Sequence, residues 1–229
     1  MIPIKDNIPS GTYPFVTVTL IALNAAVFLY QLSLGMPGIE NFIYKTAAIP
    51  VEITSLYDIG PSAIVPLPFT LLTSIFVHGG LFHIGGNMLF LWIFGDNVED
   101  RFGHLAFFVF YLLAGVAASM AHIMLEPEST VPMVGASGAI AGVLGAYFLL
   151  FPKAQVNTLV ILPLYISMVR LPALFFLGFW FFLQLLNSGA SAAGGASGGV
   201  AWFAHVGGFV VGVAGALVYK ALSAAFGSH

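Results

Sequence analysis

The sequence predicts an all-α, polytopic membrane protein with six transmembrane helices and both termini in the cytoplasm. Of its 229 residues, 59% are hydrophobic and only 7% are charged, and the mean hydropathy is +1.01. Soluble domains carry about 25% charged residues, so a chain this apolar has the lipid bilayer as its solvent. The positions of its few basic residues then indicate the number and direction of the spans.

Six stretches approach the roughly 20 mostly apolar residues that a helix needs to cross the hydrocarbon core. They are Pro14–Leu34, Phe69–Phe94, Leu105–Leu125, Val134–Phe151, Leu171–Leu186 and Ala201–Leu222. The start of the second stretch is also compatible with a loop or a re-entrant segment. We therefore expect a membrane domain over residues 14–222 and cytoplasmic tails at 1–13 and 223–229. The N-terminal residues lack the features of a signal peptide, so the first stretch is expected to be a retained span.

A further apolar stretch, Val156–Val169, is interrupted by Pro163. We interpret it as a strand-like or interfacial lead-in to the fifth helix; the rival is a short seventh span. With six spans and the N-terminus inside, only Lys45 lies outside, and five basic residues lie in the cytoplasm: Lys5, Arg101, Lys153, Arg170 and Lys220. A seventh span would reduce this positive-inside bias to three against three, which favours six spans.

The segments between the spans exclude several classes of function. All nine acidic residues lie outside the predicted spans, so the bilayer interior offers no carboxylate for a proton relay, a cation site or a Ser-His-Asp triad. Asp96–Gly103 is expected to form a polar inside turn. Ser188–Gly199 is expected to form an outer loop, either as a passive linker or as a mobile gate beside a site. The chain has no cysteine, no basic run and no evident internal repeat, which argues against disulfides, nucleic-acid binding and inverted-repeat transporters.

Polar side chains in membrane spans are costly and need a reason. The candidates are His78, His83, Asn87, His122, Ser137 and His205. Ser137 and His205 lie near the starts of the fourth and sixth spans, which both run inward, so the two residues share one depth. His83 and Asn87 lie one turn apart in the outer half of the second span. Three helices thus present polar groups at one level, while no role follows for His122.

Small residues permit two of these helices to approach closely. Ala141 follows Ser137 on its helix face, and Gly208 and Gly212 follow His205 on its face. Small faces let helix backbones come together in lipid. A serine hydroxyl can then reach an imidazole nitrogen, which is the arrangement that a general base needs to activate a nucleophile.

Other interpretations of the same residues stay open. Ser137 taken alone could bond the carbonyl four residues before it, and His83 with Asn87 could join two helices. His78, His83 and His205 could bind a metal, but no acidic or thiolate ligand and no HExxH motif accompany them. We therefore expect no metal and no cofactor.

Taken together, three motifs resemble those of the rhomboid family of intramembrane serine proteases. They are HGGLFHIGGN (His78 to Asn87), GASG (Gly135 to Gly138) and AHVGGFVVG (Ala204 to Gly212), in matching order, spacing and span position. The resemblance covers roughly Phe69 to Val218. It implies a rhomboid-like bundle of the minimal six-span bacterial or archaeal type. It also implies a multi-pass protein of the cell inner (plasma) membrane, whose active site opens toward the extracytoplasmic side.

The resemblance also implies a role for each matched residue. Ser137 corresponds to the nucleophile and His205 to the general base. Asn87 and His83, with the backbone N–H of Ser137, correspond to the groups that hold the oxyanion. His78 corresponds to a histidine that supports the outer loops.

Four glycines match as well, and two positions depart from the family. Gly135 and Gly138 would line the site, and Gly208 and Gly212 would let the sixth span approach the fourth. The Ser188–Gly199 loop would cover the site. Many relatives carry Trp-Arg where this chain has Phe69 and Thr70, and some carry tyrosine, stacked on the base, in place of Ala141. What orients His205 is therefore left open.

The function that the resemblance implies is a serine endopeptidase without a cofactor. Its partners would be transmembrane protein substrates and membrane lipid, not nucleic acid or metal. We expect single-span substrates with small or helix-breaking residues near the outer face. The alternatives are a catalytically inactive rhomboid-like membrane-protein binding factor and a small transporter or channel.

Overall fold

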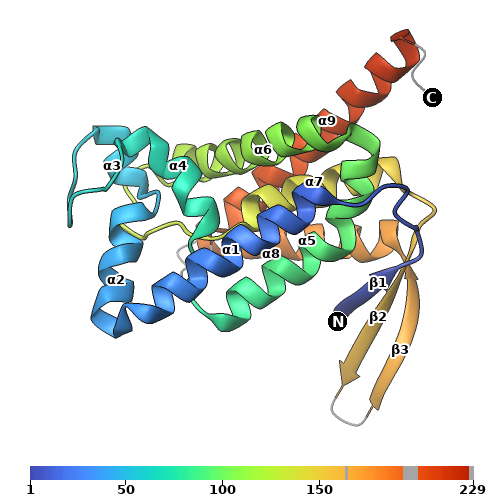
Figure 1. Ribbon diagram of the computed structural model, residues 1–229, viewed down its shortest axis with the longest axis horizontal. Coiled ribbons are helices and arrows are strands. Elements are labelled where there is room, and N and C mark those ends of the chain that lie inside the picture. The colour runs from blue at the N-terminus through green and yellow to red at the C-terminus, as the bar shows by residue number, and fades with distance from the viewer. Residues whose placement is uncertain (163–164, 193–200, 227–229) are drawn as a thin grey trace.

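The computed structural model of the chain describes residues 1–162, 165–192 and 201–226. Figure 1 shows a bundle of helices with a small sheet at one end. The bundle consists of α1 (Phe15–Ser33), α5 (Leu81–Phe102), α6 (His104–Leu125), α7 (Ser137–Leu150), α8 (Ala173–Ala192) and α9 (Trp202–Phe226). Short elements connect α1 to α5: α2 (Gly35–Thr46), α3 (Pro50–Ser55), η1 (Leu67–Phe69), α4 (Thr70–Thr73) and η2 (Ser74–Phe76).

Within the described ranges, four helices are long and apolar enough to cross a membrane: α1, α6, α8 and α9. A fifth span results if α5 is joined to the preceding segment Leu67–Phe76, but the two are bent by 81°. The predicted stretch Phe69–Phe94 is therefore not one continuous helix. The break falls at Gly79 and Gly80, which have low helix propensity. α7 is apolar but only 14 residues long, so the chain is a polytopic helical protein with four to five spans by length.

The expectation of an all-α fold is wrong, because the chain also forms a three-stranded antiparallel sheet. Its strands are β1 (Ile2–Asp6), β2 (Gln155–Leu162) and β3 (Tyr165–Pro172), in the order β1-β2-β3. The strand-like interpretation of Val156–Val169 is confirmed: β2 and β3 form a hairpin that projects from the bundle and leads into α8 (Figure 1). β1 lies within the predicted N-terminal tail and pairs with β2.

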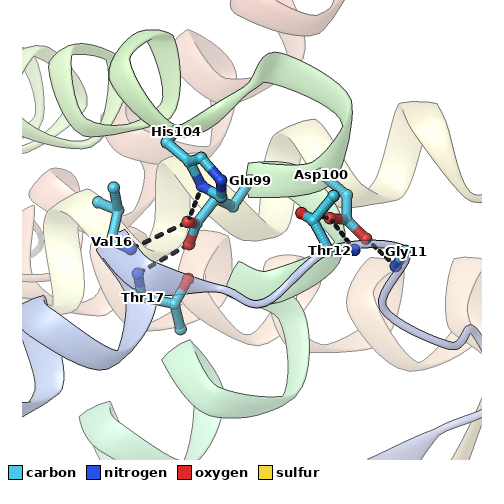
Figure 2. Close-up of polar contacts among 7 residues, drawn as sticks. All are labelled: Gly11, Thr12, Val16, Thr17, Glu99, Asp100 and His104. Atoms are coloured by element: carbon cyan, nitrogen blue, oxygen red, sulfur yellow. Dashed lines mark hydrogen bonds and ion pairs between the residues drawn. The ribbon is translucent and has the colours of Figure 1, made fainter.

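The predicted polar turn Asp96–Gly103 is also wrong. α5 continues to Phe102, and only Gly103, with a φ of +79°, separates it from α6. The acidic side chains are used instead to hold the segment that enters α1. Asp100 accepts hydrogen bonds from the backbone of Gly11 and Thr12 (Figure 2).

Glu99 caps the start of α1 from this neighbouring helix. Its two carboxylate oxygens accept the backbone N–H groups of Val16 and Thr17 at 2.9 and 2.8 Å, and it also contacts Nδ1 of His104 (Figure 2). The first N–H groups of a helix lack intrahelical partners and favour negative charge. This explains how a fully buried carboxylate is tolerated here.

α7 lies at the centre of the bundle and packs most closely against α9. A Cβ atom added to Gly145 would lie 2.1 Å from the carbonyl oxygen of Phe209, and one added to Gly212 would lie 1.9 Å from that of Gly142. The two backbones are thus in direct contact. Any larger residue at these positions would force the helices apart.

Candidate active site

A cavity of about 700 Å³ opens at the N-terminal end of α7, away from the sheet. Its walls come from α5, α6, α7, α8, α9 and the loop before α7. The polar residues that line it include His83, Asn87, His122, Ser137, Gln184 and His205.

Ser137 and His205 are brought into hydrogen-bond contact in this cavity. Ser137 is the first residue of α7, and His205 lies in the first turn of α9. The distance from Oγ of Ser137 to Nε2 of His205 is 2.8 Å. The contact depends on the small residues below it, because a Cβ atom on Gly208 would lie 2.2 Å from the carbonyl oxygen of Gly138.

The second ring nitrogen of His205 contacts a residue that the sequence reasoning missed. Nδ1 lies 2.8 Å from Oε1 of Gln184 on α8. The rings of Trp180 and Trp202 flank the imidazole, with centroids 6.0 and 5.9 Å away. A signal was available, since Gln184 is a lone amide within the apolar run FFLGFWFFLQLL and a buried polar group in lipid needs a partner.

His83 and Asn87 of α5 face the loop immediately before Ser137. A Cβ atom on Gly135 would lie 2.6 Å from Nε2 of His83 and 3.4 Å from Nδ2 of Asn87. Both nitrogens therefore lie close to the backbone of Gly135, where there is no room for a side chain. Gly135 has a φ of +115°, a conformation that only glycine adopts readily.

Asn87 has unused hydrogen-bonding capacity. Its side chain is 8% exposed, and Nδ2 is buried without a hydrogen-bond partner among the described residues. A buried polar group left unpaired costs about 1–3 kcal/mol. Together with the first N–H groups of α7, which have no intrahelical acceptor, this amide can bind an anionic oxygen placed beside Ser137.

His78 lies beneath the site and does not line the cavity. Its Nε2 lies 3.5 Å from the backbone N–H of Ala136, and its own backbone N–H and carbonyl bond the side-chain amide of Gln31 on α1. The loop that carries Ser137 is further held by Gly135, whose N–H donates to the carbonyl of Ser74 at 2.9 Å.

The remaining sequence candidates lie outside this cluster. His122 is on the α6 wall of the cavity, 3.8 Å from Glu126. Phe69 is exposed, and Thr70 is buried and donates to the carbonyl of Leu67. In the part of the chain that the structure describes, no three His, Asp or Glu side chains are grouped to hold a metal.

The outer loop expected over Ser188–Gly199 differs from the structure in its first part. Residues 188–192 continue helix α8. Residues 193–199 lie outside the described residues, and so does most of the predicted cover over the site.

The site combines a hydroxyl, a base in contact with it and a group of hydrogen-bond donors beside it. This set can attack a carbonyl carbon, accept the proton of the hydroxyl and stabilise the resulting oxyanion. Acyl transfer is the chemistry that uses all three features.

Comparison with known proteins identifies the family of the chain. The Rhomboid domain family matches residues 68–221. The mitochondrial Rhomboid protein 1 of Saccharomyces cerevisiae is 30% identical over 161 residues, which cover 66% of this chain and 42% of the relative. The Rhomboid protease GluP of Bacillus subtilis is 32% identical over 142 residues, which cover 62% of this chain and 25% of the relative. The chain thus spans less than half the length of these curated relatives.

Proposed function

The chain belongs to the rhomboid family, and on that premise we propose that it is an intramembrane serine endopeptidase that uses a Ser137–His205 dyad. One observation carries the proposal: Oγ of Ser137 lies 2.8 Å from Nε2 of His205 at the wall of an open cavity. A base in hydrogen-bond contact with a hydroxyl is the requirement for activating a serine nucleophile.

In the proposed reaction, Ser137 attacks the scissile carbonyl while His205 accepts its proton and later donates it to the leaving amine. Asn87, His83 and the backbone N–H of Ser137 would hold the oxyanion. The close approach of both side-chain nitrogens to Gly135, two residues before Ser137, supports this assignment. Such donors lower the barrier because charge develops on the oxygen only as the reaction proceeds.

The substrates we propose are transmembrane proteins whose backbone becomes extended near the membrane surface. A helical segment keeps its carbonyl groups hydrogen-bonded, so the segment to be cut must unwind before Ser137 can reach it. Glycine or other helix-breaking residues lower the cost of unwinding.

We further propose six membrane crossings within residues 14–222, with α5 and α7 as the second and fourth, and both termini in the cytoplasm. The basic residues support this orientation. Lys5 and Arg170 both pair in the sheet with Asn157, and Arg101 lies over the ring of Phe151. These groups lie at the sheet end of the bundle, so the positive-inside rule directs the cavity toward the extracytoplasmic side.

Active-site labelling tests the proposal. We expect a fluorophosphonate probe to label the purified protein in liposomes, and Ser137→Ala to abolish labelling together with cleavage of single-span substrates. Ser33→Ala is the matched control, because Ser33 is exposed at the end of α1 and bonds only the carbonyl of Tyr30 among described residues. Equal labelling of the wild type and Ser137→Ala would favour the alternative, a catalytically inactive rhomboid-like protein that binds membrane proteins.

A further inference from the structure

A Ser-His dyad consists of a nucleophile and a base, with no third side chain that orients the base. In this chain Gln184 contacts the base, His205. We propose that Gln184 is a positioning residue, which fixes the tautomer and the ring orientation of His205 so that Nε2 is free to accept the proton of Ser137. The proposal rests on the proposed function, and it gives α8 a part in the reaction that is exerted through His205.

The direction of the hydrogen bonds follows from the backbone. The Gln184 amide donates through Nε2 to the carbonyl oxygen of Trp180 at 3.1 Å. A carbonyl oxygen can only accept, so the NH₂ group must lie on that side and Oε1 must face His205. Because Oε1 also can only accept, Nδ1 of His205 must carry a hydrogen. A neutral imidazole has one N–H, so Nε2 is left with its lone pair toward Ser137.

No other contact of His205 can select this tautomer among the described residues. The two flanking tryptophans present an indole N–H, which donates and does not accept. Their rings, at 36° and 89° to the imidazole, limit the space for ring rotation but leave the two tautomers equivalent. Position 141 offers only a methyl group. The selection therefore rests on Oε1 of Gln184.

Gln184 is held rigidly enough to do this. Its side chain is 6% exposed, and its amide is fixed at one end by Trp180. Its own carbonyl accepts the hydroxyl of Ser188 at 2.8 Å. A glutamine is also suited to this place, because a carboxylate would bring a buried charge that is costly whenever His205 is neutral.

Two substitutions separate positioning from packing. Gln184→Met keeps the length of the side chain and removes the acceptor. Gln184→Glu keeps an oxygen acceptor in either ionisation state. Asn24→Leu is the matched control, because Asn24 is also buried and its amide also bonds the carbonyl four residues earlier, on α1.

The primary readout is ¹⁵N NMR of histidine-labelled protein in micelles, with His205 assigned from the His205→Ala difference. We expect the Nδ1–H tautomer in the wild type and in Gln184→Glu, and its loss of preference in Gln184→Met. In turnover, we expect Gln184→Met to lower kcat about 10- to 100-fold with KM within about twofold. That loss is smaller than the ~10⁴ that a wrong tautomer costs in a Ser-His-Asp enzyme.

Persistence of the Nδ1–H tautomer in Gln184→Met would overturn the proposal. So would a loss of turnover in Gln184→Met that Asn24→Leu reproduces, because the effect would then be one of stability. The NMR readout does not require activity. The wild type could lack Ser137-dependent cleavage while the His205 tautomer still changes in Gln184→Met. That result would refute the proposed protease function but would support the positioning of His205 by Gln184.

Discussion

The two ends of the helical bundle use their buried polar groups differently. At the sheet end, the carboxylates of Glu99 and Asp100 accept hydrogen bonds from backbone N–H groups of the segment that enters α1. At the cavity end, two nitrogens of side chains that line the cavity are buried without a hydrogen-bond partner among the described residues: Asn87 Nδ2 and His122 Nδ1. Other buried atoms of this kind lie away from the cavity, among them Nδ1 of His78 beneath it and Oγ1 of Thr17 at the sheet end. Unpaired groups cost stability, so the hydrogen-bonded carboxylates of the sheet end hold the fold together, while the unpaired nitrogens that line the cavity stay available for a ligand.

The largest effect that would sharpen this contrast is expected at the cavity end. Asn87→Ala should lower kcat about 10²–10³-fold, because one oxyanion donor is lost. The free energy of unfolding should change by no more than about 1 kcal/mol, because no hydrogen bond of the resting protein is removed. Cleavage kinetics and denaturation of the same preparation measure both. An unchanged kcat would show that Asn87 is not an oxyanion donor.

The reverse pattern is expected at the sheet end. Glu99→Gln should lower the free energy of unfolding by about 2–3 kcal/mol, because the new amide NH₂ faces a backbone N–H that has lost its charged acceptor. Turnover per folded molecule should stay within about twofold. Glu128→Gln is the control, since Glu128 is exposed. If Glu99→Gln lowered turnover without lowering the free energy of unfolding, the sheet end would have a part in catalysis and not only in stability.

The smallest effect concerns pH and the sheet. Burial, together with the charge of Asp96, raises the pKa of Asp6 from 3.8 to about 6, although the hydroxyl of Tyr147 donates to its carboxylate. Between these values the folded protein binds more protons than the unfolded chain. The contribution of Asp6 to stability should therefore be fully present below about pH 4 and should be lost as the pH rises through 6.

Asp6→Asn should flatten this decrease, because the asparagine does not titrate. Thermal unfolding of the wild type and the variant at a series of pH values from 4 to 7 provides the measurement. Parallel curves for the two proteins would show that Asp6 does not carry the pH dependence.

The meeting of Ser137 and His205 at one level could be predicted because it depends on local information. The proposed direction of each span rests on a few charges, and the small faces follow from helical periodicity. The contact of Gln184 with His205 depends on how α8 rotates against α9, and residue spacing does not contain that angle. Even so, an isolated amide in an apolar span indicates that a hydrogen-bond partner lies nearby.

The sheet end was predicted least well, for a related reason. β1 has five residues and pairs with β2, about 150 positions further along the chain, so no local pattern identifies it. The last turns of α5 look like a polar turn in isolation. They stay helical because Glu99 and Asp100 find backbone donors in a segment more than 80 residues earlier.

The glycine contact between α7 and α9 determines how the site responds to mechanical stress. Gly208 lies against the backbone of Gly138, so at this contact no flexible side chain separates the helices that carry Ser137 and His205. The distance between α7 and α9 therefore changes little under stress, because two backbones in contact are hard to compress. α8 presents many exposed apolar side chains, among them Phe175, Phe182 and Leu186. A thinner bilayer or a higher temperature should therefore alter the tilt of α8, and with it the hold of Gln184 on His205, before it alters the spacing of the dyad.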